Sequence, residues 1–287
     1  MEKYKKYKKN QYFILTAKSL MMYVDTFKSF KVATVNLFNN EGKRMISTLE
    51  NELTIHTPDL VVFQEAGTRF HIKGYDNIQW GGGDTKYENM GAALRNNTEW
   101  KSVQIKTFRT KLCNTLRDVV KIILKNKQNP AIQIKIGNVH LCGGRYDEEV
   151  SQYKTNHDLI KTKEEGIKLL EDCDIVLGDF NSDIHHFLNK IPNKQQEIFL
   201  KDKLWTDEQI EIWNTTPYKL LERKKFKLVP PEKRTSFFGG TTDVIWYKKN
   251  KLLLANNGII DMGIKKAKRQ EDGASDHNGV YATFLFV

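Results

Sequence analysis

The 287-residue chain is strongly basic, with 46 lysine and arginine residues against 35 acidic ones and a formal net charge of +11. Hydrophobic residues make up 39% of the chain, which is enough for a core and excludes a wholly disordered protein. A surface of this charge attracts polyanions, so we expect nucleic acid or an anionic membrane as a partner, and we favour nucleic acid.

The three cysteines, Cys113, Cys142 and Cys173, are widely spaced. This pattern excludes a disulfide framework and a zinc-type spacing, and it favours a reducing compartment. No apolar run approaches the ~18–20 residues of a membrane span. We therefore expect an intracellular monomer, cytoplasmic or nuclear, that is neither secreted nor inserted in a membrane.

The chain begins with a lysine run over residues 1–10, for which we expect a solvated tail. The alternative is a basic arm that contacts nucleic acid or a localisation signal. Residues 12–24 carry apolar side chains at helical spacing. We therefore divide the chain into a basic N-terminal extension over 1–29, partly helical, and one domain over 30–287.

The first elements of this domain follow a strand–helix–strand order. Residues 30–38 are rich in Val, Thr and Phe and predict a buried strand. Residues 41–56 predict an amphipathic helix that ends before Pro58, and 59–65 a second apolar strand. This order predicts a sheet covered by a helix.

Strands dominate the remainder of the chain. Four successive strands with short links, which favour antiparallel pairing, are predicted over 90–95, 103–110, 118–125 and 131–142. Helices are predicted over 157–172 and over 206–222, the second opened by a Thr206/Gln209 capping box. The remaining strands are predicted over 175–180, 241–248, 257–264 and 279–287. The pattern indicates one α/β domain with many strands, some of them antiparallel.

Polar side chains stand at the ends of the most apolar predicted strands. They are Asn36, Glu65, His140, Asp179, Asn181, Asp243, Asp276 and His277. Functional sites form where strand ends and loops converge, so these residues are candidates for one site. Carboxylates with an asparagine oxygen suit Mg²⁺ or Mn²⁺, and the absence of cysteine argues against zinc. Histidines beside such a metal suit phosphoryl transfer.

Each element also has an ordinary structural explanation. Glu65 suits a helix cap, and the GDFNSD segment at 178–183 suits an Asx turn. His140 suits an ordinary core position. Asp243 is less easily explained in this way, because aspartate is disfavoured in strands and is costly when it is buried unpaired.

The order of the motifs resembles the endonuclease/exonuclease/phosphatase superfamily, which includes deoxyribonuclease-like and abasic-endonuclease-like metal-dependent phosphoesterases. The matching segments are VATVNLFNN (32–40), DLVVFQEA (59–66), NVHLCGG (138–144), DIVLGDFNSD (174–183), TTDVIWY (241–247) and SDHNGVYATF (275–284). GDFN and SDH are the most specific of them. The first segment departs from the family pattern, because Val35 stands where an aromatic residue is usual. The resemblance implies a four-layer αββα sandwich of two mixed β-sheets with helices outside.

The resemblance also implies the metal ligands and the attacking group. Asn36 and Glu65 would bind the divalent metal, with Asp276 nearby as a further ligand or as a holder of water. Asp179 would orient and deprotonate the attacking water.

The phosphate contacts are implied in the same way. Asn181 and His140 would hydrogen-bond the scissile phosphate. His277 would stabilise the charge that develops on it, and Asp243 would hold His277 in its tautomer and orientation.

The substrate class depends on loops and on charge. The segment 217–234 holds seven basic and two acidic residues just before Asp243, and we expect it to overhang the active-site edge. Its basic cluster, defined as Arg223, Lys224, Lys225 and Lys227, would then bind nucleic acid; the alternative is a solvated helix end.

We therefore expect a Mg²⁺-dependent phosphodiesterase, with Mn²⁺ as a possible replacement, that acts as a nuclease on DNA or RNA. A phosphatase of a small or lipid phosphate ester is the alternative within the class. A non-catalytic nucleic-acid-binding relative is the alternative outside it.

Overall fold

The computed structural model describes most of the chain from Lys28 onward. The described ranges are 28–38, 43–81, 89–109, 118–143, 156–190, 197–198, 200–201, 204–231, 234–237, 240–264 and 274–287. The lysine run at 1–10 and the predicted helix at 12–24 lie outside the described residues.

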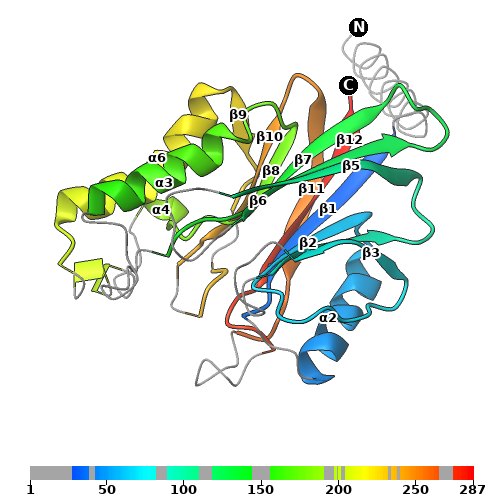
Figure 1. The fold of residues 1–287 in the computed structure, drawn as a ribbon, viewed down its shortest axis with the longest axis horizontal. Helices are drawn as coiled ribbons and strands as arrows, with labels where there is room; N and C mark the ends of the chain where they lie inside the picture. The colour runs from blue at the N-terminus through cyan, green and yellow to red at the C-terminus, as the bar shows by residue number, and fades with distance from the viewer. Residues whose placement is uncertain are drawn as a thin grey trace, which may run out of the picture.

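Two six-stranded mixed sheets pack face to face (Figure 1). The first sheet has the order β11-β12-β1-β2-β4-β3. Its strands are β1 (Ser29–Asn36), β2 (Leu60–Gln64), β3 (Tyr75–Gly81), β4 (Met90–Arg95), β11 (Leu252–Ile260) and β12 (Gly279–Phe286). The second sheet has the order β5-β6-β7-β8-β10-β9. Its strands are β5 (Trp100–Arg109), β6 (Asp118–Asn126), β7 (Gln133–His140), β8 (Ile175–Asp179), β9 (Phe226–Leu228) and β10 (Asp243–Lys248).

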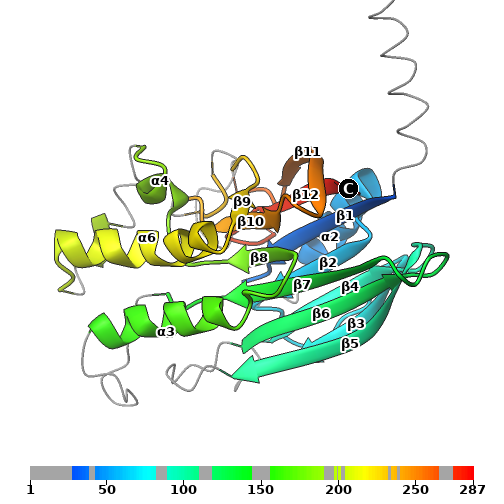
Figure 2. The same ribbon diagram turned by 90° about the horizontal axis from the view of Figure 1, so that it is seen from above.

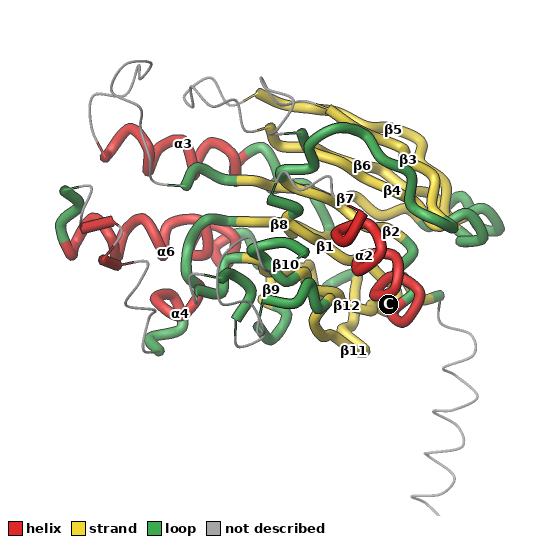
Figure 3. The backbone as a smooth tube through the Cα atoms, turned by 90° about the horizontal axis from the view of Figure 1, so that it is seen from below, coloured by secondary structure: helices red, strands yellow, loops and turns green. Residues whose placement is uncertain are grey.

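Helices cover the outer faces of both sheets. They are α2 (Lys43–His56), α3 (Asn156–Lys168), α4 (Ile184–Phe187) and α6 (Asp207–Arg223). Figures 2 and 3 show α3 and α6 side by side next to the second sheet, with α2 on the side of the first sheet. The molecule is therefore an αββα sandwich, which confirms the predicted fold class.

Successive side chains of each strand point to opposite faces of the sheet, and this alternation builds the layers. In β1, Phe30 and Val32 enter the core between the sheets, whereas Ala33 and Val35 pack under α2. On the outer face of the second sheet, Ile167 and Leu170 join a separate cluster with Tyr218 and Leu221 of α6. Each fully buried Val, Leu, Ile or Phe side chain contributes about 1.5–3 kcal/mol, so these three clusters hold the four layers together.

Most predicted elements are present, and the capping box of α6 is confirmed. Thr206 accepts from the Gln209 backbone N–H at 3.2 Å, and the Gln209 side chain accepts from the Thr206 N–H at 3.0 Å. The prediction of four successive antiparallel strands is wrong for the first of them. Strand β4 pairs with β2 and β3 in the first sheet, and only β5, β6 and β7 form the antiparallel run.

Three elements were missed, and a fourth begins earlier than predicted. Strands β3 and β9 and the short helix α4 were not predicted. Strand β11 begins at Leu252 rather than near 257, because a register shift between Leu254 and Asn256 breaks its alternation.

The cysteines do not all fit the reducing compartment that we expected. Cys142 is disulfide-bonded, whereas Cys173 is a buried free thiol. Within the described ranges, no helix is long and apolar enough to cross a membrane.

Candidate active site

The strand registers bring the candidate residues to one edge of the sandwich. Parallel pairing of β1 with β2 and of β7 with β8 places their carboxyl ends together. His140 lies opposite Asp179, and antiparallel β10 places Asp243 on the other side of Asp179. Residues directly opposite in neighbouring strands point to the same side of a sheet, so His140, Asp179 and Asp243 form a row.

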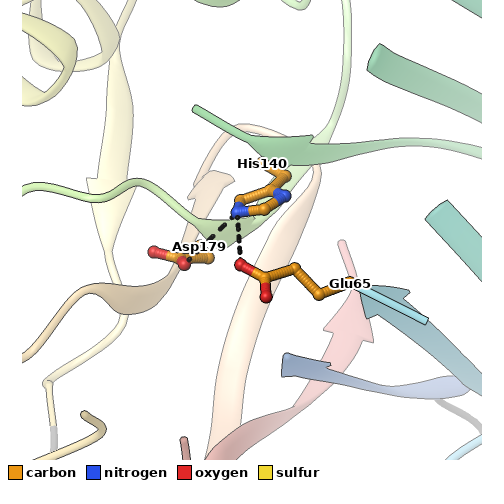
Figure 4. Close-up of side chains that lie close together, drawn as sticks. All are labelled: Glu65, His140 and Asp179. Carbon is orange, nitrogen blue, oxygen red and sulfur yellow. Dashed lines mark ion pairs between the residues drawn. The ribbon is translucent and has the colours of Figure 1, made fainter. Parts of the chain in front are cut away.

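Glu65 joins this row from the other sheet (Figure 4). Its Oε1 lies 3.2 Å from His140 Nε2, and that nitrogen lies 3.7 Å from Asp179 Oδ2. Glu65 follows β2 with a left-handed φ of 47°, a conformation that costs of order 1–3 kcal/mol and is concentrated at functional sites. The three ligand atoms lie within 4.8 Å of one another, close enough to share one metal ion.

Asn36 lies within the same cluster but presents its amino group to it. Its Nδ2 donates to Asp179 Oδ2 at 3.0 Å and lies 3.4 Å from Glu65 Oε1. Its Oδ1 accepts from the Phe38 backbone N–H at 2.9 Å, which fixes the orientation of the amide. The arrangement therefore places Asn36 as a hydrogen-bond donor to both carboxylates, and its role as an oxygen ligand stays a prediction.

His277 and Asp243 form a buried pair beside Asp179. His277 Nδ1 lies 2.7 Å from Asp243 Oδ2, the contact that the predicted orienting role requires. Burial lowers the pKa of His277, but the carboxylates of Asp243, Asp276 and Asp179 outweigh it and raise that pKa well above its usual value. Asp179, Asp243 and His277 form a second group whose ligand atoms lie within 4.8 Å of one another.

Asp276 lies next to His277, with its Oδ1 3.9 Å from His277 Nε2. Two groups of carboxylate and imidazole atoms in the described ranges are compact enough for a metal ion, and Asp276 belongs to neither. The preceding Ser275 ties this loop to β1, because its hydroxyl donates to the Asn36 carbonyl at 2.7 Å.

The GDFN segment forms the Asx turn that is its structural explanation, directly beside the cluster. The Asn181 N–H donates to Asp179 Oδ1 at 2.8 Å, so the Asx turn is present, and Asn181 has a left-handed φ of 47°. Asn181 Nδ2 donates to the Leu141 carbonyl at 2.8 Å, which joins this turn to the end of β7. Gly178 is required by close packing, since a Cβ there would lie 2.0 Å from the Val139 carbonyl oxygen.

A fully buried lysine, which we did not predict as a site residue, holds this turn through hydrogen bonds. Lys163 of α3 donates through Nζ to the carbonyls of Phe180 at 3.0 Å and Asn181 at 2.7 Å, and to Ser182 Oγ at 2.5 Å. The Trp213 ring lies 3.5 Å from Nζ, and Trp213 Nε1 also donates to the Asn181 carbonyl at 3.1 Å. The signal in the sequence is the place of Lys163 between Ile160 and Ile167 on the apolar stripe of the helix.

The basic cluster does not lie at this edge. Lys227 pairs with Tyr247, which pairs with Ile175, so it stands at the opposite ends of β8 and β10. Tyr247 is four positions along β10 from Asp243, a span of roughly 13 Å. Lys224 makes an ion pair with Glu171 at 2.8 Å. The prediction that Arg223, Lys224, Lys225 and Lys227 overhang the active-site edge is therefore wrong.

No protein-family model and no curated protein match this chain by sequence. Among solved structures, an endonuclease/exonuclease/phosphatase family protein from Bacteroides thetaiotaomicron is similar, with 16% identity and a TM-score of 0.57 over 91% of this chain and 99% of that chain. TDP2 from D. rerio, complexed with a single-strand DNA product, matches with 14% identity and a TM-score of 0.58 over 90% of this chain and 99% of that chain.

A mannosyl-6-phosphatase from Bacteroides thetaiotaomicron matches with 15% identity and a TM-score of 0.54, over 90% of this chain and 100% of that chain. At these identities the likeness concerns the fold. The chain has the fold of the endonuclease/exonuclease/phosphatase proteins, as its motifs predicted.

Proposed function

We propose that this protein is a divalent-metal-dependent phosphodiesterase that hydrolyses nucleic acid. The observation that carries the proposal is the buried row of His140, Asp179 and Asp243 that Glu65 and His277 complete from the first sheet and its adjoining loop. A non-catalytic binding protein does not require so many buried ionisable groups in contact, because burying them is costly.

The residues of this cluster fit a hard cation. Glu65 and Asp179 both offer carboxylate oxygens, and both contact the same two side chains, His140 and Asn36. Two anionic groups so close together repel each other, and a bound cation relieves that repulsion. Oxygen-rich sites of this kind suit Mg²⁺ or Mn²⁺. A bound ion of this class would polarise a phosphoryl oxygen and neutralise charge on the phosphate. Glu65 is our first ligand, and Asp276 is a further candidate.

Side chains of the cluster would take the other roles in the reaction, which are proton transfer, charge stabilisation and positioning of the phosphate. Asp179 accepts a proton from the water whose oxygen attacks phosphorus, while the bond from phosphorus to the leaving oxygen breaks. His277, kept protonated by the carboxylates around it, faces the charge that develops on the phosphate, and Asp243 fixes its tautomer through Nδ1. Asn181 and His140 position the phosphate on the other side of Asp179.

Two observations favour nucleic acid as the substrate. The net charge of +11 attracts a polyanion, and TDP2, which shares this fold, was solved with a single-strand DNA product. A second candidate, a phosphatase of a small phosphate ester, is favoured by the same fold in a mannosyl-6-phosphatase.

The test is a panel of labelled single- and double-stranded DNA, RNA, abasic and 5′-tyrosyl oligonucleotides, together with a hexose 6-phosphate, assayed with Mg²⁺, with Mn²⁺ and in EDTA. We expect metal-dependent cleavage of at least one oligonucleotide and none in EDTA. Cleavage of the sugar phosphate alone would replace the nuclease proposal with the phosphatase. No metal-dependent turnover of any substrate, with oligonucleotide binding retained, would establish the non-catalytic alternative.

A further inference from the structure

The outer face of β5, β6 and β7 carries a set of lysines that the active site does not use. This lysine face is defined as Lys101, Lys106, Lys121, Lys125 and Lys135. The neighbouring residues along the same strands, such as Val120, Ile122 and Ile134, enter the core between the sheets. Because side chains alternate along a strand, Lys121, Lys125 and Lys135 point away from that core. Lys101 and Lys106 pair with Lys125 and Lys121 and lie on the same side, since a register shift between Ser102 and Gln104 separates them along β5.

Cross-strand pairing concentrates the charge. Lys101 lies directly opposite Lys125, and Lys106 directly opposite Lys121. Like charges in directly opposed positions destabilise a sheet. Asp172 relieves part of this repulsion, since its oxygens lie 2.5 Å from Lys121 Nζ and 3.3 Å from Lys135 Nζ. Within the described ranges, Lys101, Lys106 and Lys125 have no ion-pair partner, so the face retains a net positive charge.

A hollow lies within the lysine face. It has a volume of about 230 Å³, and its lining includes Lys106, Phe108, Lys121 and Lys135. Lys121 Nζ lies 5.1 Å from the centre of the Phe108 ring. An aromatic ring among cations is the combination by which proteins hold single-stranded nucleic acid, with bases stacked on the ring and phosphates near the lysines.

The lysine face ends near the active-site edge, on the opposite side of β7 from the His140 side chain, because Val139 packs in the outer cluster and His140 meets Glu65 of the other sheet. Phe108 lies opposite Val119, Val119 lies opposite Val139, and the next residue along β7 is His140. Two strand spacings of ~4.8 Å place Phe108 roughly 10 Å from the end of β7. In the other direction the lysines continue along β5 as far as Lys101, a stretch of seven residues or roughly 20 Å.

We propose that the lysine face binds the phosphate backbone of a single-stranded nucleic acid whose scissile phosphate lies at the active site. This proposal rests on the proposed function and replaces the basic cluster around Lys225 as the polyanion contact. The occupant is single-stranded because the bases must be free to reach Phe108, and the length of the face suits about four nucleotides.

The test compares two variants that lose the same charge. One carries Lys101→Ala, Lys106→Ala and Lys125→Ala, and the matched control carries Arg223→Ala, Lys225→Ala and Lys227→Ala. Binding of a 5′-fluorescein-labelled 20-nucleotide thymidine oligomer is followed by anisotropy in EDTA between 50 and 200 mM NaCl. If each lysine contacts one phosphate, the slope of log K against log salt falls by about 2 for the first variant, at ~0.7 per contact. The control keeps the wild-type slope. Equal slopes in the two variants would overturn the proposal.

Further measurements separate this proposal from the proposed function. Hydrolysis of bis(p-nitrophenyl) phosphate, which is too small to reach the lysine face, should be unchanged in the first variant. A Lys→Arg replacement at the same three positions should restore the wild-type slope; loss of slope with arginine would show a packing role and overturn the proposal. Binding to phosphatidylserine vesicles and not to the oligonucleotide would overturn it in favour of a membrane contact.

The two proposals can also fail independently. Normal oligonucleotide cleavage with no effect of the lysine variant refutes the lysine face alone. Oligonucleotide binding that depends on these lysines, without turnover of any phosphodiester, refutes the proposed function alone.

Discussion

Lys163→Met tests whether the buried lysine positions the GDFN turn for catalysis. Methionine preserves most of the volume but removes the three Nζ donors that bind the Phe180 carbonyl, the Asn181 carbonyl and Ser182 Oγ. The Asn181 carbonyl keeps its bond from Trp213 Nε1, whereas in the described ranges the Phe180 carbonyl keeps none. Leaving one buried acceptor unsatisfied costs about 1–3 kcal/mol.

The catalytic consequence is expected to exceed the loss of stability. Asn181 holds a left-handed backbone next to Asp179, and displacement of a catalytic group by about 1 Å lowers the rate by roughly 10²-fold. We expect kcat for bis(p-nitrophenyl) phosphate to fall by about one to two orders of magnitude, with little change in KM. Stopped or continuous absorbance assays at saturating Mg²⁺ measure both constants.

Tyr218→Phe is the matched control for this variant. The Tyr218 hydroxyl donates to the Ser182 carbonyl at 2.5 Å, so its removal also leaves one carbonyl of the same loop without that donor. It should lower the free energy of unfolding by a similar amount, about 1–3 kcal/mol, and leave kcat unchanged. Equal losses of kcat in the two variants would attribute the effect to general destabilisation. A Lys163→Met protein with reduced stability and normal kcat would refute the positioning argument.

Three further predictions concern the metal, the histidine pair and the free thiol. EDTA should abolish activity, and Glu65→Gln should raise the Mg²⁺ concentration required for half-maximal rate; an unchanged titration would remove Glu65 from the ligands. His277→Ala and Asp243→Ala should each lower kcat by about 10²–10⁴-fold, with strongly non-additive effects in the double variant because one acts through the other; additive losses would show that they act separately. Burial raises the pKa of Cys173 to about 12, so native protein at pH 8.5 should resist iodoacetamide at this residue, as peptide mass spectrometry would show. Because the pKa is raised in the folded protein, the thiol's contribution to stability is complete below about pH 8.5 and is lost as the pH rises toward about 12. Rapid labelling of the native protein would contradict the burial of Cys173.

The sequence predicted which polar residues gather at one edge better than it predicted the connections between strands. Asn36, Glu65, His140 and Asp179 were found because each follows an apolar run, and carboxyl ends of parallel strands meet at one edge. The sheet to which β4 belongs could not be predicted in this way, because pairing depends on contacts distant in sequence.

The failure of the basic cluster has a related cause. Arg223–Lys227 is close to Asp243 in sequence, but β9 must first pair with the far end of β10 before the chain returns to the site. Proximity along the chain therefore placed it at the wrong end of the strands. The lysine face was overlooked for the converse reason, since its members lie on three strands and become a group only when the register is known.

The site spans two sheets, and this makes the relative position of the sheets part of the mechanism. Glu65 comes from the first sheet and His140 from the second, so their 3.2 Å contact depends on how the sheets align. Apolar packing between sheets is non-directional and tolerates small displacements. A buried hydrogen bond does not: Gln64 Nε2 donates to Asn138 Oδ1 at 2.6 Å, and Asn138 Nδ2 donates to the Phe63 carbonyl at 3.1 Å.

These polar groups are fully buried, and Gln64 stands one residue before Glu65 while Asn138 stands two residues before His140. Burial of unpaired amides would cost several kcal/mol, so the two sheets have a strong preference for the one alignment that pairs them. That same alignment brings Glu65 to His140. The amide pair of Gln64 and Asn138 therefore supplies the directional constraint that the apolar core lacks, and it explains how a site with members from separate sheets can be preorganised to the precision that catalysis requires.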